Sequence, residues 1–157
     1  MIAGFVRPSI PDDSKYLADR LRKADMDEIA ASLGTDASAL DALEQGRRFS
    51  LQPLTVVALS EDSQDPVAML GAVPLGEGVG RIWLLGTDTI FERGTAFARQ
   101  SRDWWRHVAS PFSEVTNCVD MRNEVHIRWL KWCGCRFVNI RSCGVNGEPF
   151  LEFIWRP

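Results

Sequence analysis

The side chains that suit acid–base chemistry are scattered along this chain. Glu77 lies in a glycine-flanked turn, Asp120 lies at the end of a predicted strand, and His126 and Cys133 share one predicted helix. A carboxylate or an imidazole can take a proton from an amine nucleophile, and a thiol can give one to a leaving group. Each residue also has an ordinary structural role, and the sequence does not single out one of them as catalytic.

The stretch 123–137, NEVHIRWLKWCGCRF, predicts a short helix that leads straight into a strand. Asn123 suits the N-cap, because its side chain accepts hydrogen bonds from the free amides of the first turn. Gly134 suits the left-handed residue that ends a helix. Val125, Trp129 and Cys133 recur at helical spacing on one face. Any stable helix between two strands would need these features, so they do not by themselves indicate a function.

The rest of the chain predicts alternating helices and strands. Turn residues and β-branched runs mark the strands, and apolar residues at helical spacing mark the helices. We expect strands near 4–10, 54–62, 67–78, 78–88, 113–121, 135–143 and 149–157, and helices near 14–24, 26–34, 35–46, 89–109 and 123–134. This order predicts one α/β domain over 1–157, with a mixed central sheet of about seven strands flanked by helices.

Composition limits the classes of function. The chain has 157 residues, 45% hydrophobic and 25% charged, as in a soluble globular protein. Its net charge of −3 argues against a nucleic-acid binder. The segment 27–48 resembles a helix-turn-helix, but acidic residues in its second helix would repel phosphates. We expect no membrane span, no secretory signal and reduced cysteines. We also expect no metal site, because Cys133 and Cys135 lack the usual spacer between zinc ligands.

The order of elements resembles the GNAT superfamily of acyl-CoA-dependent N-acyltransferases. A typical family helix begins with Asn, carries Ile-Arg-Phe-Tyr and ends before a glycine, and this chain has Asn123, Ile127-Arg128-Trp129-Leu130 and Gly134. The resemblance implies that acetyl-CoA or another acyl-CoA lies between the strand 81–86 and the strand 115–120. It also implies a phosphate loop within 87–96. The cofactor-binding residues implied are Leu84, Leu85, Gly86, Arg93, Gly94, Thr95, Ala96 and Asn123.

The sequence departs from the family at two places. The residue pattern of the family's phosphate loop fits neither Phe91-Gly94-Ala96 nor the same spacing begun at Arg93. In addition, Asp88 places a negative charge where a pyrophosphate would bind. Leu130 stands where many members carry a tyrosine that protonates the leaving thiolate. Neither departure supports an active transferase.

A second resemblance is to GNAT-like internal virion or internal core proteins of short-tailed bacteriophages, which carry His-Ile-Arg as at His126-Ile127-Arg128. It implies a virion or host protein as partner, and a location in the host cytoplasm during infection or in the virion. An exposed residue of the Trp104-Trp105 pair would then mark a partner surface, although two partly buried core residues are the favoured interpretation of this pair. Two hypotheses stay open: a fold relative with a degenerate acyl-CoA site, which the chemistry favours, and an active N-acyltransferase.

Overall fold

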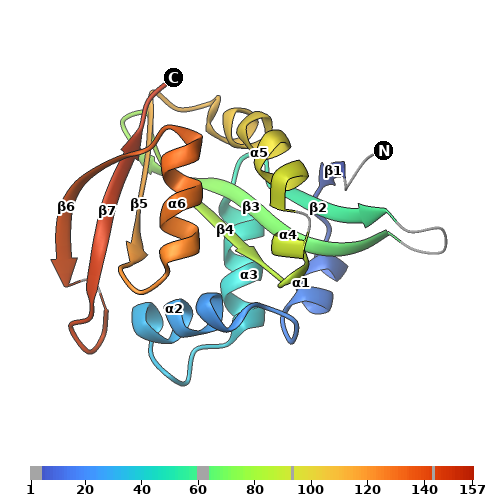
Figure 1. Ribbon diagram of the computed structural model, residues 1–157, viewed down its shortest axis with the longest axis horizontal. Helices are drawn as coiled ribbons and strands as arrows, with labels where there is room; N and C mark the ends of the chain where they lie inside the picture. Colours follow the sequence, from blue (N-terminus) through green and yellow to red (C-terminus); the bar gives the residue numbers. More distant parts are fainter. Residues whose placement is uncertain (1–4, 60–63, 93, 143) are drawn as a thin grey trace.

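The computed structural model describes residues 5–59, 64–92, 94–142 and 144–157 (Figure 1). In chain order the elements are β1 (Phe5–Pro8), α1 (Pro11–Leu17), α2 (Lys23–Leu33), α3 (Ala39–Phe49), β2 (Leu54–Leu59), β3 (Gln64–Gly76), β4 (Val79–Gly86), α4 (Thr89–Glu92), α5 (Gly94–Ala109), β5 (Glu114–Asp120), α6 (Glu124–Cys133), β6 (Arg136–Ser142) and β7 (Pro149–Trp155). The predicted fold class, α/β with a mixed sheet of seven strands, is confirmed.

One seven-stranded sheet runs through the molecule in the order β1-β2-β3-β4-β5-β7-β6. Every neighbouring pair is antiparallel except β4 and β5, which are parallel. A parallel pair needs a crossover connection, and α4 and α5 provide it. The central strands carry apolar side chains on both faces, so both faces must be covered.

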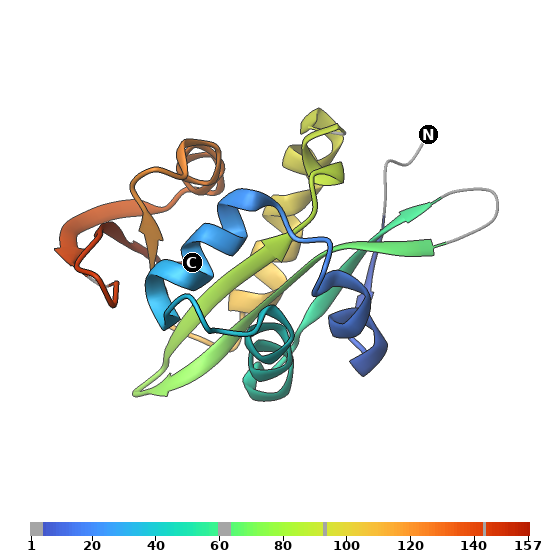
Figure 2. The ribbon, with the colours of Figure 1, turned by 90° about the horizontal axis from the view of Figure 1, so that it is seen from below.

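Helices cover the two faces of the sheet (Figures 1 and 2). On one face α1 and α3 bury Leu17 and Leu43 against Met69 of β3. On the other face α5 and α6 contribute Trp105 and Leu130 to the larger core. Within the described residues, no helix is both long enough and apolar enough to cross a membrane.

The strands β4 and β5 separate soon after they meet. They pair only at Val79–Glu114, Gly80–Val115 and Arg81–Thr116. Further along, the side-chain amide of Asn117 donates to the carbonyl of Ile82 at 2.7 Å and bridges the widening gap. The sheet therefore has an opening between two adjacent strands near its centre.

The helix α2 lies across the carboxyl ends of β4 and β5 (Figure 1). The backbone amide of Arg22 donates to the carbonyl of Gly86 at 2.9 Å, and the amide of Gly86 donates to Oδ2 of Asp25 at 2.9 Å. The amide of Asp120 donates to Oε1 of Glu28 at 2.7 Å. The helix is thus attached to both strands that border the opening.

The first helices differ from the prediction. The helix predicted for 14–24 begins earlier, at Pro11, and ends at Leu17. Proline suits the first helical position because its missing N–H is not needed there. The chain then turns, because the amide of Arg22 binds β4, and α2 starts at Lys23. Of the apolar residues at helical spacing in the predicted helix 26–34, which are Met26, Ile29, Ala30 and Leu33, Ile29 is buried as expected, but Leu33 is 61% exposed while Asp25 is fully buried.

The third helix passes through the glycine that was predicted to end it. It runs on to Phe49, and Gly46 lies inside it. A Cβ atom at Gly46 would lie 2.6 Å from Cζ2 of Trp83. The glycine is required by the close approach of α3 to β4 rather than by a helix end.

The long helix predicted for 89–109 is observed over Thr89–Glu92 (α4) and Gly94–Ala109 (α5), on either side of Arg93, which the structure does not describe. Its two adjacent tryptophans, Trp104 and Trp105, are 7% and 2% exposed. The favoured interpretation of the pair as core residues is confirmed, and the alternative that one of them marks a partner surface is wrong. Both side chains fill the core beneath the sheet, where Trp105 makes an edge-on contact with Trp129.

The caps predicted for α6 are confirmed. The side chain of Asn123 accepts from the amide of His126 at 3.3 Å, and Gly134 adopts a left-handed conformation with φ of 95°. The helix is therefore held at both ends by the residues that the sequence indicated.

Candidate functional site

A cleft of about 280 Å³ opens where β4 and β5 separate. We call it the β4–β5 cleft. Its lining comes from both faces of the sheet, because it contains Glu28 and Gln45 from the helices on one side and Trp105 and Leu130 from the other. The cleft therefore passes through the gap between the strands.

A second cavity, of about 310 Å³, lies on the α5–α6 side of the sheet. We call it the α5–α6 groove. It is lined by Arg22, Leu84, Ile90, Phe97, Ala98, Val125, His126, Arg128, Trp129 and Trp132. Leu84, His126 and Trp129 line both cavities, so the groove and the cleft meet at these three residues.

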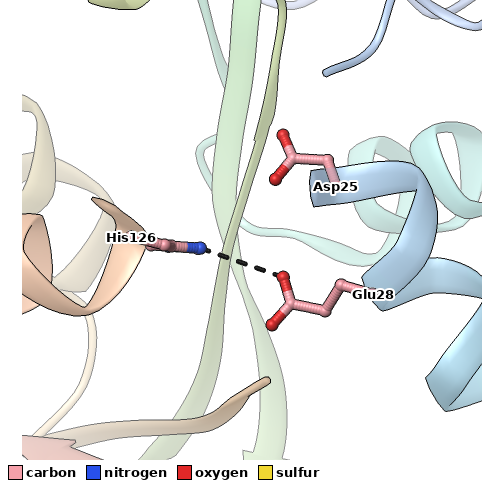
Figure 3. Close-up of side chains that lie close together, drawn as sticks. All are labelled: Asp25, Glu28 and His126. Carbon is pink, nitrogen blue, oxygen red and sulfur yellow. Dashed lines mark ion pairs between the residues drawn. The ribbon is translucent and has the colours of Figure 1, made fainter. Parts of the chain in front are cut away.

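The carboxylate of Glu28 lines the β4–β5 cleft and lies beside His126, one of these three residues (Figure 3). One oxygen accepts the amide of Asp120, and the side chain is 15% exposed. The pKa of Glu28 is raised to about 7, mainly by burial and also by the negative charges of Asp25 and Asp120, against the hydrogen bond from the Asp120 amide. A carboxylate with a pKa near neutrality is suited to take a proton from a substrate and release it.

His126 faces Glu28 from the first turn of α6 (Figure 3). Its Nδ1 lies 3.9 Å from Oε2 of Glu28, which is too long for a hydrogen bond. The pKa of His126 is lowered to about 4, mainly by burial and also by the positive charge of Arg22, although the charge of Asp25 acts in the opposite direction. The imidazole is therefore neutral at pH 7, and the contact is not an ion pair at that pH.

Asp25, Glu28 and His126 each place a potential ligand atom within 4.8 Å of the others. Both oxygens of Asp25 are already bonded: Oδ1 accepts Nη2 of Arg22, and Oδ2 accepts Nε of Arg22 and the amide of Gly86. A cation would have to displace the guanidinium and would lie beside its positive charge. The donor set therefore does not fit a metal ion.

Beyond Arg81, the backbone N–H and C=O groups of β4 that face β5 lie along the gap. In a strand, alternate residues aim their N–H and C=O groups to the same side. The carbonyl of Ile82 faces β5, since it accepts from Asn117. The groups of Leu84 face the same way, and those of Gly86 are taken by Asp25 and Arg22. Leu84 is thus the residue whose amide points into the opening where the cavities meet.

The candidate catalytic residues from the sequence fall in different places. His126 lies at the junction, as described above. Asp120 is buried at the end of β5, where hydrogen bonds from Arg122 lower the pKa of its carboxyl. Glu77 lies in the turn between β3 and β4 with φ of 54°, and it lines neither cavity. Cys133 is buried, which raises the pKa of its thiol to about 12.

The implied cofactor residues are partly brought together. Leu84, Leu85 and Gly86 form the end of β4, and Leu84 and Leu85 line the cleft. Gly94, Thr95 and Ala96 lie at the start of α5. Arg93 lies outside the described residues. The expected phosphate loop is not one loop, since α4 occupies part of it.

Asn123 is buried beside Glu28, and its side-chain amide counteracts the rise in the pKa of that carboxyl. Its principal observed role is the N-cap of α6. That cap sets the first turn of the helix and so places His126 at the junction.

Sequence reasoning missed Glu28 and Asp25. A signal was available, because Asp25, Glu28, Ile29 and Ser32 share one face of a helix at helical spacing. Two acids beside a core isoleucine are costly to bury, and they indicate either partners or a site. The apolar pattern of Met26, Ile29, Ala30 and Leu33 predicts a buried face centred away from the two acids, but only Ile29 of these four residues is buried.

The comparisons with known proteins find matches in fold but none in sequence. No protein-family model matches the chain, and no curated protein matches it in sequence. Solved structures match over almost its whole length. Ard1 from Thermoplasma volcanium superposes with a TM-score of 0.72 at 14% identity, covering 99% of this chain and 98% of that one. The fold is that of GNAT acetyltransferases.

Two further matches were solved with ligands. A GNAT superfamily phosphinothricin acetyltransferase from Sinorhizobium meliloti, in complex with AcCoA, has a TM-score of 0.68 at 9% identity, covering 99% of this chain and 89% of that one. AAC(6')-Ib, in complex with ribostamycin and coenzyme A, has a TM-score of 0.67 at 12% identity, covering 98% and 93%. At these identities the likeness establishes the fold.

Proposed function

We propose that this protein is an acyl-CoA-dependent N-acyltransferase that uses Glu28 as its general base. The observation that carries the proposal is the junction of the two cavities at Leu84, His126 and Trp129, with Glu28 beside it. Two substrates that enter from opposite faces of the sheet would meet there. The fold shared with acetyltransferases supports the same function.

The α5–α6 groove suits the acyl-CoA arm. Its walls are mainly apolar, with Ile90, Phe97 and Trp132 among them. Arg128, exposed at the edge of the groove, adds a positive charge for an anionic group. Asp88 is exposed and lines neither cavity, so its charge is screened by solvent.

The amide of Leu84 suits the carbonyl of a thioester. An N–H group fixed in the backbone stabilises the negative charge that develops on the carbonyl oxygen, and it needs no reorganisation as the reaction proceeds. The neighbouring side chains of Trp105 and Leu130 exclude water from this end of the cleft and strengthen that interaction.

Glu28 suits the amine acceptor. The acceptor arrives as an ammonium ion and gives one proton to the Glu28 carboxylate. Its nitrogen then forms a bond to the thioester carbon, and the C–S bond breaks with its electron pair on sulfur. The nitrogen then releases its second proton. Water relays a proton to the CoA thiolate, which leaves as the thiol. Leu130 cannot donate a proton, and Cys133 with a pKa of about 12 is a poor acid for this step.

Titration calorimetry with acetyl-CoA, with desulfo- and dephospho-CoA as comparisons, tests the proposal. We expect micromolar binding, and we expect Val125→Glu to weaken it at least about tenfold, because the new charge enters an apolar groove. Glu124→Gln is the matched control, since Glu124 precedes Val125 on α6 but lines neither cavity. Absence of heat at millimolar acetyl-CoA, combined with no acylation of any amine, would refute the function.

A role as a phage virion or host-interaction component is a second proposal. It rests on the His126-Ile127-Arg128 motif, and it would place the protein in the host cytoplasm during infection or in the virion. Burial of the tryptophan pair removes the surface first suggested for a partner. Detection of the protein in purified particles by mass spectrometry would support this role, and its absence from them would refute packaging.

A further inference from the structure

The β4–β5 cleft carries opposite charges at two separate places. Arg81, Trp83 and Leu85 all line it and point to the same face of β4, because alternate residues of a strand share a face. Arg81 is exposed, and across the described ranges its guanidinium has neither a hydrogen bond nor an ion pair. The acid in the cleft is Glu28, which reaches it from α2.

The separation of Glu28 and Arg81 follows from the strand register. Arg81 is paired with Thr116, and Glu28 accepts the amide of Asp120, four residues further along β5. Four residues of strand span about 13 Å, so Arg81 and Glu28 enter the cleft at positions about 13 Å apart along β5. An arginine side chain that leans along the cleft shortens the gap between the charged groups.

The lining between the two charges is mainly apolar. Trp83 and Ile29 belong to it, and the indole of Trp83 is held by a hydrogen bond from Nε1 to Oγ of Ser50 at 2.9 Å. The side-chain amide of Asn117, which also lines the cleft, already donates to the carbonyl of Ile82. Methylene groups lie favourably against an apolar surface. The cleft therefore offers an acid at the amine end, an apolar middle and a guanidinium at the far end.

We propose that the amine acceptor is an extended primary amine that ends in a carboxylate. This inference rests on the proposed function and specifies its acceptor. Glu28 would take the ammonium group, the apolar wall would hold the chain, and Arg81 would bind the carboxylate through two parallel hydrogen bonds. Short amines would reach only one end of the cleft.

A series of ω-amino carboxylic acids, from glycine to 8-aminooctanoate, tests the inference with n-alkylamines of matched length as comparisons. We expect kcat/KM for the longer amino acids to exceed that for the matched alkylamines by about tenfold to a hundredfold, the range for a hydrogen-bonded charge. Arg81→Gln should bring this ratio close to one. Arg136→Gln, which changes an exposed arginine on β6 outside both cavities, should keep the ratio of the natural protein.

A charge reversal makes the test independent of lost activity. Arg81→Glu should invert the preference, so that α,ω-diamines are better acceptors than the amino acids of the same length. Equal turnover of amino acids and alkylamines by the natural protein would overturn the inference and leave the proposed function intact. Failure of every amine, together with no acyl-CoA binding, would overturn both.

Discussion

Glu28 and Asp120 are joined by a hydrogen bond of 2.7 Å from the backbone amide of Asp120 to Oε1 of Glu28. The bond attaches α2 to the strand on one side of the opening. It also fixes the direction of the carboxylate, so that the second oxygen, Oε2, faces His126. The candidate base is therefore positioned by the backbone of the sheet, together with the side-chain amide of Asn123.

The first prediction concerns the base itself. Glu28→Gln should lower kcat by about a hundredfold or more, because the amide cannot take a proton. In the natural protein kcat should rise with pH through a midpoint near 7, the pKa of Glu28, and this limb should vanish in the variant. Asp27→Asn is the control, since Asp27 pairs with Lys23 on the exposed side of the same helix. Retention of the limb in Glu28→Gln would assign it to another group.

The second prediction concerns stability at alkaline pH. The pKa of Glu28 is raised from 4.5 to about 7 by folding, so its contribution to stability is complete below 4.5 and is lost as the pH rises through 7. The shift corresponds to about 3 kcal/mol. Glu28→Gln does not titrate and should gain about that much relative to the natural protein between pH 4.5 and 8. Urea unfolding at several pH values measures the difference, and parallel curves would contradict the burial effect.

The third prediction concerns stability at acidic pH. The pKa of His126 is lowered from 6.5 to about 4, so its contribution is complete above 6.5 and is lost as the pH falls through 4. His126→Gln should remove this limb, worth about 3 kcal/mol, while the alkaline limb of Glu28 stays. His107→Gln is the matched control, because His107 is exposed on α5. Equal acid sensitivity of both variants would show that His126 is not the group that titrates.

The fourth prediction concerns the amide at the junction. Leu84→Pro removes the N–H that faces the gap but leaves the pairing with β3 intact, whereas Leu85→Pro removes an amide that faces β3. We expect Leu84→Pro to fold and to lose about a hundredfold in kcat relative to Leu84→Ala, and Leu85→Pro to fail to fold. Circular dichroism and steady-state kinetics separate these results. A folded Leu84→Pro protein with the kcat of Leu84→Ala would exclude this amide from the reaction.

The fifth prediction concerns the wall of the cleft. Gly46→Ala places a methyl group 2.6 Å from the Trp83 ring, which must move and strain its hydrogen bond to Ser50. We expect a loss of about 1–3 kcal/mol in the free energy of unfolding, and a higher KM for the amine. Gln45→Ala, on the same helix, should be close to neutral in unfolding. Identical unfolding curves for both variants would show that the contact is relaxed in solution.

Much of the fold was predictable because its signals are local. The caps Asn123 and Gly134 and the strand patterns depend on neighbouring residues, and they placed most elements correctly. The end of α3 was misplaced because Gly46 serves a contact with Trp83, which is distant in sequence.

The site was harder to predict because burial decides its chemistry. Glu28 becomes a candidate base only through contacts with Asp120 and the enclosed cleft, which one helical segment does not reveal. The departures at Leu130 and in the expected phosphate loop had favoured a degenerate site. The structure supplies a carboxylate that this reasoning had not considered.

The attachment of α2 also has a consequence for biosynthesis. Asp25 binds an amide 61 residues later in the chain, and Glu28 binds one 92 residues later. During translation the helix leaves the ribosome long before its partners exist, and contacts of such large sequence separation form late and slowly. The nascent protein therefore completes its candidate base among its last folding events, and a ribosome stalled before residue 120 would hold a chain with α2 unanchored at β5.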